Sequence, residues 1–109
     1  MATVNKVLGQ SKPTAASLTT LYTVPAQYST VSSSIVVCNQ SASPTSFRIA
    51  IRPAGASIDP KHYLYYDTPI LGNDTFIATI GITLATTDIV SVYCTLATVS
   101  FNLFGAEVS

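Results

Sequence analysis

The segment Thr45–Arg52 has the strictest alternation of apolar and polar side chains in the chain, and it constrains the fold most. Every second residue from Phe47 to Ile51 is large and apolar, and the positions between and after them include Arg48 and Arg52. Successive side chains of a strand point to opposite faces. The segment is therefore predicted to be a half-buried antiparallel strand with one face in the core.

Further segments rich in β-branched and aromatic residues are separated by proline, glycine and serine clusters, and no stretch of helical length shows a 3.6-residue period. Residues 81–87 are predicted to be a connection with a short 3₁₀ turn. The pattern predicts an all-β fold, a single antiparallel β-sandwich of immunoglobulin-like or jelly-roll-like type with seven to eight short strands. The other predicted strands are 18–24, 28–39, 62–68, 75–80, 88–93 and 99–104.

The same period of two assigns side chains to faces in three of these strands. In 99–104, Val99, Phe101 and Leu103 alternate with Ser100, Asn102 and Phe104. In 28–39 it places Val31, Ser33, Ile35 and Val37 on one face. In 62–68 it places Tyr63, Tyr65 and Asp67 on one side of the strand, opposite His62, Leu64 and Tyr66.

A chain of 109 residues is expected to form one domain with one core. Residues 1–12 are predicted to be an N-terminal arm or edge strand, because Lys12-Pro13 interrupts the pattern that precedes it. Residues 13–109 are predicted to be the β-sandwich domain.

Charge is scarce: 9% of the residues are Asp, Glu, Lys or Arg, against about 25% in typical domains, and the net charge is zero. A nucleic-acid partner is not expected, because Arg48, Arg52 and Lys61 are the only candidates for a phosphate-binding patch. A neutral surface also protects weakly against self-association. The chain is thus either a secreted or stable β-domain with a hydroxyl-rich surface or a subunit covered by other subunits.

A membrane partner is not expected either. The apolar runs, such as residues 35–38, are far shorter than the roughly 20 residues of a membrane-spanning helix. The N-terminal residues lack the apolar stretch of a signal peptide, so synthesis in the cytoplasm is expected.

No catalytic or metal-binding constellation is visible. His62 is the only histidine, and a structural zinc site needs about four nitrogen or sulfur ligands. A nucleophile would need this histidine and a third group to orient it, and no G-x-S-x-G motif is present. The chain is predicted to be no enzyme and to bind no cofactor or metal.

Cys38 and Cys94 suggest an immunoglobulin-type bridge between sheets, but two observations favour free thiols. Tyr93 directly precedes the second cysteine instead of lying two residues before it, and the chain has no tryptophan. Synthesis in a reducing compartment also disfavours a disulfide.

The segment 61–76 gathers the groups most suited to recognition. The candidate contact residues are His62, Tyr63, Tyr65, Tyr66 and Asp67. Tyrosines on both faces of a strand can fill the core with the hydroxyl at its rim, occupy a subunit interface, where tyrosine is enriched, or stack on a sugar. All three roles remain open from the sequence.

Taken together, six segments give the chain a resemblance to a known group. They are LYTVPA (21–26), SSIVVCN (33–39), FRIAIRPAGA (47–56), KHYLYYDTPILGNDTF (61–76), GITLATTDIVSVY (81–93) and VSFNLFGAE (99–107). In this order they resemble small structural proteins of tailed-bacteriophage virions.

The resemblance implies a non-enzymatic β-sandwich in the virion, with other virion proteins as partners and homo-oligomers expected. It implies a tail, baseplate or fibre-associated protein, with a capsid decoration protein as the alternative. A glycan-binding module that contacts the host surface is the alternative of a different class. No catalytic residue is carried over.

Overall fold

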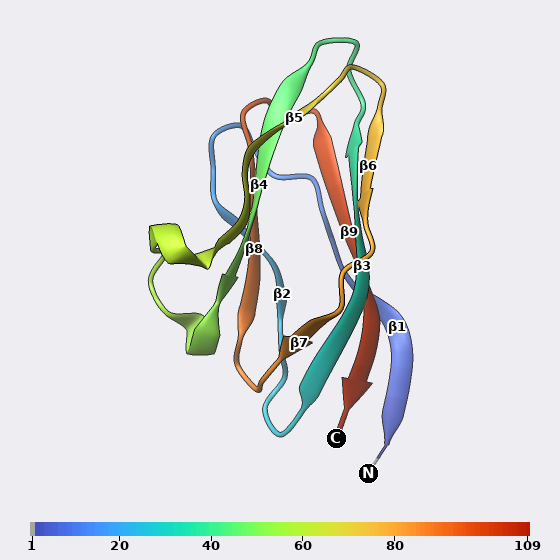
Figure 1. Cartoon of the computed structure of the whole chain (residues 1–109), viewed down its shortest axis with the longest axis vertical. Coiled ribbons are helices and arrows are strands. Elements are labelled where there is room, and N and C mark those ends of the chain that lie inside the picture. Colours follow the sequence, from blue (N-terminus) through green and yellow to red (C-terminus); the bar gives the residue numbers. More distant parts are fainter. Residues whose placement is uncertain (1) are drawn as a thin grey trace.

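The computed structural model describes residues 2–109, which form nine strands in two antiparallel sheets (Figure 1). The predicted all-β sandwich is confirmed; the strands number nine instead of seven or eight. Met1, the first residue of the predicted arm, lies outside the described residues. The strands are β1 (Thr3–Ser11), β2 (Thr19–Thr23), β3 (Ser29–Asn39), β4 (Thr45–Arg52), β5 (Tyr63–Ile70), β6 (Thr75–Ala78), β7 (Ile82–Leu84), β8 (Ile89–Cys94) and β9 (Val99–Val108).

Sheet A contains β1, β9, β3 and β6 in that order, with β7 also paired to β3. Sheet B contains β2, β8, β4 and β5. The two sheets lie as separate layers in Figure 1. Strands from the two ends of the chain pair with one another: β1 with β9, β2 with β8, β3 with β6 and β7, and β4 with β5. The paired strands thus lie one pair inside another along the chain, as in one long hairpin, and this hairpin folds over into two layers.

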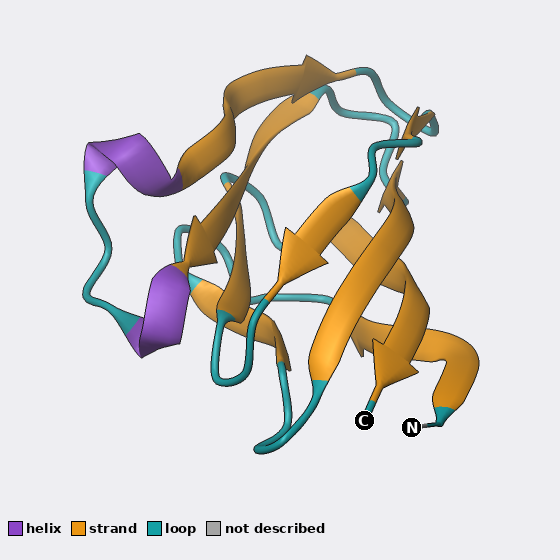
Figure 2. Ribbon diagram, turned by 60° about the horizontal axis from the view of Figure 1, so that its bottom comes forward, coloured by secondary structure: helices purple, strands orange, loops and turns teal. Residues whose placement is uncertain are grey.

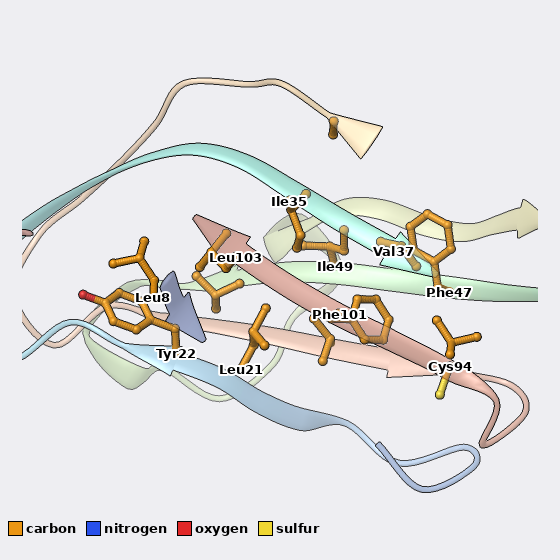
Figure 3. Close-up of a cluster of buried hydrophobic side chains, with 14 of the residues drawn as sticks. Leu8, Leu21, Tyr22, Ile35, Val37, Phe47, Ile49, Cys94, Phe101 and Leu103 are labelled. Atoms are coloured by element: carbon orange, nitrogen blue, oxygen red, sulfur yellow. The ribbon is translucent and has the colours of Figure 1, made fainter. Parts of the chain in front are cut away.

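The core lies between the sheets, and Figure 3 shows its side chains converging from both layers. Phe47 and Ile49 of β4 and Phe101 and Leu103 of β9 are at most 1% exposed. The facing predicted for β4 and β9 is confirmed at these positions. Strict alternation suffices here because each strand turns one continuous face to the opposite sheet.

The prediction that Val31 and Ser33 share the face of Val37 is wrong. The register of β3 against β9 shifts between Ser32 and Ser34, which makes Ser33 the extra residue of a β-bulge. Before the bulge the buried position is Ser32, and Val31 is 47% exposed. A single inserted residue inverts the facing of everything that precedes it.

Two further segments differ from their predictions or refine them. Within 81–87, residues 82–84 form β7 and pair with β3, so the predicted simple connection is wrong. The N-terminal segment is an edge strand that pairs with β9 from Thr3 to Ser11. Gly9, beside the register shift in this pairing, lies against sheet B, where an added Cβ would clash with the Leu21 carbonyl oxygen. Within residues 2–109, no helix is long and apolar enough to cross a membrane.

Candidate functional site

The connection between β4 and β5 projects beyond sheet B and carries two short 3₁₀ turns, η1 (Pro53–Gly55) and η2 (Pro60–His62), drawn in purple in Figure 2. Side chains of sheet B and its neighbouring loop anchor the connection. The Ala54 amide donates to Asp88 Oδ1 at 2.9 Å, and the Arg52 guanidinium donates to the Ala56 carbonyl at 3.1 Å. These bonds give the loop a defined position relative to the sheet.

His62 belongs to η2 and is only 8% exposed. Its Nδ1 accepts a hydrogen bond from the Asp59 amide at 3.1 Å, and Asp59 Oδ1 accepts one from the Lys61 amide at 3.2 Å. This reciprocal arrangement is a capping box, which satisfies backbone donors at the start of the turn. The buried ring therefore shapes the loop and presents little surface for contact. Within residues 2–109 no three His, Cys, Asp or Glu side chains form a metal-binding group.

Tyr65 points toward the core. Its ring centroid lies 5.3 Å from that of Phe76 and 6.3 Å from that of Phe47. Of the roles left open by the sequence, this half-buried tyrosine has the core role.

Tyr63 and Tyr66 lie together on the outer face of sheet B, so the prediction that they occupy opposite sides of the strand is wrong. Their ring centroids are 4.9 Å apart and the ring planes meet at 81°. The register of β5 against β4 shifts twice between Tyr63 and Thr68. Asp67 there has φ of 49°, in the left-handed region. These irregularities bring residues three apart onto one face.

Arg48 is the centre of this outer face. Its Cζ lies 4.2 Å from the Tyr66 ring centroid and 4.3 Å from that of Tyr93. Its Nε donates to Asp67 Oδ1 at 2.6 Å and its second terminal nitrogen donates to Oδ2 at 3.3 Å. We call Arg48, Tyr63, Tyr66, Asp67 and Tyr93 the tyrosine–arginine cluster. The hydrogen bonds to Asp67 raise the pKa of Arg48 above its ordinary value, so the guanidinium remains charged.

An open cavity lies between this cluster and the projecting loop. It has a volume of about 510 Å³. Tyr66, which is 59% exposed, and Tyr63 form one wall, and the loop forms the other. The lining residues are Ile58, Asp59, Pro60, Tyr63 and Tyr66. Only Tyr63 and Tyr66 of the predicted contact residues line it; Ile58, Asp59 and Pro60 were missed because sequence alternation gives no signal for a loop that folds back on a strand.

The outer face of sheet A differs from that of sheet B in its charge. The five strands of this sheet contain only two charged residues, Lys6 and Glu107. These two form an ion pair at 3.1 Å, and Glu107 is 7% exposed and turned toward the interior. The outer face of sheet A therefore carries no carboxylate and no guanidinium, and its one exposed charged group is the paired ammonium of Lys6 in the edge strand β1.

Glu107 is a buried polar group that sequence reasoning missed. Its Oε2 accepts a hydrogen bond from the Tyr22 hydroxyl of sheet B at 2.6 Å, and this hydroxyl lies 2.8 Å from Thr30 Oγ1. The bond to Tyr22, and secondly Lys6, hold the pKa of Glu107 below its ordinary range. Burial and the bond to Glu107 raise the pKa of Tyr22 to about 12. The sequence does contain a signal for its burial, because position 107 continues the alternation of the buried residues Val99, Phe101 and Leu103.

Aliphatic and aromatic side chains are spread across the outer face of sheet A. Val7, Val31 and Ile77 are 46%, 47% and 62% exposed, and Val36 and Phe104 are half-buried between them. A second open cavity, of about 450 Å³, lies on this side. It is lined by Asn5, Lys6, Val31, Ser33, Phe104, Gly105 and Ala106.

The two cysteines are free thiols, one on the inner face of sheet B and the other on the outer face of sheet A. Cys94 is fully buried in the core, and burial raises the pKa of its thiol. Cys38 follows the outward phase of Val36 and is half-buried on the outer face of sheet A. The two side chains therefore point in directions that do not allow a bridge.

Comparison with protein-family models finds none that matches the chain, and searches for similar curated proteins and solved structures find no significant match. The resemblance to bacteriophage virion proteins therefore stays a prediction from the sequence.

Proposed function

We propose that the chain is a non-enzymatic structural subunit of a bacteriophage virion, at the tail, baseplate or fibres, and that it assembles with further copies of itself through the outer face of sheet A. The observation that carries the proposal is the scarcity of charge on this face: among the described residues, its five strands contain only Lys6 and Glu107, and these two pair with one another. The assignment to a bacteriophage virion rests on the resemblance to virion proteins.

A neutral face is suited to contact with a copy of itself. A two-fold interface places the same patch on both partners, so any exposed charge would approach its own copy or have to lose its hydration. The outer face of sheet A keeps both costs small, because its one exposed charged side chain, Lys6, is already paired with Glu107 at the edge of the sheet. It also offers Val7, Val31 and Ile77 for burial.

The size of this face is adequate. Four strands side by side, about 4.8 Å apart and up to about ten residues long, span roughly 20 by 30 Å. A stable interface buries about 800 Å² of accessible surface per partner, and side chains give a sheet more accessible surface than its flat projection.

The strand order supports the proposal independently. If β6 and β7 count as one interrupted strand, the nested pairs form two four-stranded sheets, as in a jelly roll. We therefore favour the jelly-roll type over the immunoglobulin-like type. Jelly rolls occur in viral capsid proteins and also in lectins and cupins. The fold alone does not assign the function, so the neutral face remains the main argument.

Oligomeric state tests the contact directly. Light scattering after size exclusion should show one discrete oligomer for the wild-type chain. Ile77→Glu, which places a charge at the most exposed apolar position of the face, should give a folded monomer. The matched control is Leu64→Glu, at an exposed leucine of sheet B, which should leave the oligomer intact. A wild-type monomer at all concentrations, or equal effects of the two variants, would refute the contact.

Cys38 provides a second readout of the same face. In the wild-type oligomer its alkylation by iodoacetamide should be slow, and in Ile77→Glu it should become faster, whereas buried Cys94 should stay unreactive in both. Equal Cys38 rates in the two proteins would show that the face is uncovered.

The particle itself is tested by mass spectrometry of purified virions of the phage that encodes the chain, followed by a density map. Peptides of the chain should be present in the particles. Density at the tail supports the proposal, density on the head supports the capsid decoration alternative, and absence from the particles would overturn both.

A further inference from the structure

We propose that the cavity lined by Ile58, Asp59, Pro60, Tyr63 and Tyr66 binds one ring of a neutral saccharide. This cavity lies against sheet B and its projecting loop, whereas the proposed contact between copies uses the outer face of sheet A. The two inferences rest on different surfaces and can fail separately.

Tyr66 supplies an exposed aromatic wall in a fixed orientation. Arg48 lies over its ring at 4.2 Å, and Tyr63 meets it edge to face. Tyr66 nevertheless stays 59% exposed and lines the cavity. The C–H groups of a sugar ring carry a small positive charge and are attracted to the negative face of an aromatic ring. The wall is already oriented, so binding costs little side-chain entropy.

Asp59 supplies the polar partner across the cavity. Its Oδ1 accepts the bond from the Lys61 amide, and its Oδ2 accepts none from the described residues. A free carboxylate oxygen accepts hydrogen bonds from hydroxyl donors, which a sugar presents around its ring. Pockets for small ligands combine a mainly apolar lining with a few polar groups in this manner.

The charge and size of the cavity narrow the ligand class. Asp59 is the only charged residue in the lining, so an anionic sugar would be repelled. Of the nearby cations, Arg48 is already paired with both oxygens of Asp67, and Lys61 is not among the lining residues. The volume of about 510 Å³ falls within the range of small-ligand pockets. A proline-rich peptide, the other ligand of aromatic surfaces, uses an extended groove.

The test is a titration of the full-length, ¹⁵N-labelled chain, followed by NMR. The probes are the methyl glycosides of glucose, galactose, mannose and N-acetylglucosamine, and the disaccharides cellobiose, lactose and maltose. At least one probe should shift the amide signals of residues 58–66 in a saturable manner. If none shifts these signals at about 50 mM, where millimolar binding would be visible, the proposal is overturned.

Variants separate stacking from general effects. Tyr66→Ala should weaken binding at least about tenfold, Tyr66→Phe should keep it because the ring remains, and Asp59→Asn should weaken it while preserving an oxygen at the cap. Leu64→Ala, an exposed neighbour outside the cavity, is the control and should bind normally. Amide spectra distant from the loop verify folding.

Three results would overturn the saccharide site. They are unchanged binding by Tyr66→Ala, shifts that fall only outside residues 58–66, and shifts of these residues by a decaproline peptide but by none of the sugars. None of them affects the oligomer test on sheet A.

Discussion

The two outer faces of the sandwich are built on the same core yet differ in almost every physical property. The outer face of sheet A is neutral, with Val7, Val31 and Ile77 exposed among hydroxyl and amide side chains. The outer face of sheet B carries the tyrosine–arginine cluster and the projecting loop. We therefore propose an extended contact for one face and a small ligand for the other.

Charge explains the difference. Sheet A has two charged residues in five strands, and they neutralise one another at its edge. On sheet B, Arg48 and Asp67 form a pair whose side chains are 22% and 47% exposed. Removing water from charged side chains is costly, so a face that contacts another copy is expected to contain few of them. A face that remains in water can keep charged side chains at little cost.

The largest expected effect compares two phenylalanines of β9 that point in opposite directions. Phe101 is fully buried between the sheets, and Phe104 is half-buried on the outer face of sheet A. Phe101→Ala should lower the free energy of unfolding by about 3–5 kcal/mol, because it leaves a cavity. Phe104→Ala in the Ile77→Glu background, without the proposed contact, should cost less than half as much. Urea unfolding measures both free energies. Equal losses would mean that Phe101 and Phe104 do not face the core and the outer surface, respectively.

The next effect concerns the inward-turned charge of sheet A. Glu107→Gln should lower the free energy of unfolding at pH 7 by about 1–3 kcal/mol, because it weakens the bonds to Tyr22 and Lys6 in a buried position. Lys6→Gln, which alters the exposed partner, should cost less. Urea unfolding at pH 7 compares them. A larger loss from Lys6→Gln would contradict the assignment of Glu107 as the buried member.

The same network predicts a pH dependence. The pKa of Glu107 is lower in the folded chain than in the unfolded one, so its contribution is complete above the ordinary value of 4.5 and is lost as the pH falls through the folded pKa. The pKa of Tyr22 is raised from 10 to about 12, so its contribution is lost as the pH rises through that range. Wild-type stability should decline in both windows, and Glu107→Gln should flatten the acid decline.

The smallest effect tests the exposed charges of sheet B. A double-mutant cycle with Arg48→Gln and Asp67→Asn should give a coupling of about 0.5–1 kcal/mol, which decreases in high salt. Asparagine tolerates the left-handed backbone at position 67, so the cycle reports the pair and not strain. A coupling energy that does not change with salt would mean that this pair is shielded from water. That result would contradict the description of the outer face of sheet B as a face that remains in water.

The composition of the cavity illustrates what sequence reasoning can and cannot find. The concentration of tyrosines at 63–66 was visible, and two of these residues line the cavity. Their common face was not visible, because it depends on bulges in the pairing of β5 with β4. Asp59 joins the cavity through its own turn in a loop, which no alternation pattern encodes.

Local chemistry by itself determined the all-β class, the position of most strands and the inward faces of β4 and β9. A strand with one buried face must alternate with a period of two, and turns need proline, glycine or short polar residues. The tertiary structure decided the facing of Val31 and Tyr66, the strand at 82–84 and the burial of Glu107. These depend on which residue of a distant strand lies opposite, and one extra residue in the pairing reverses every side chain on one side of it.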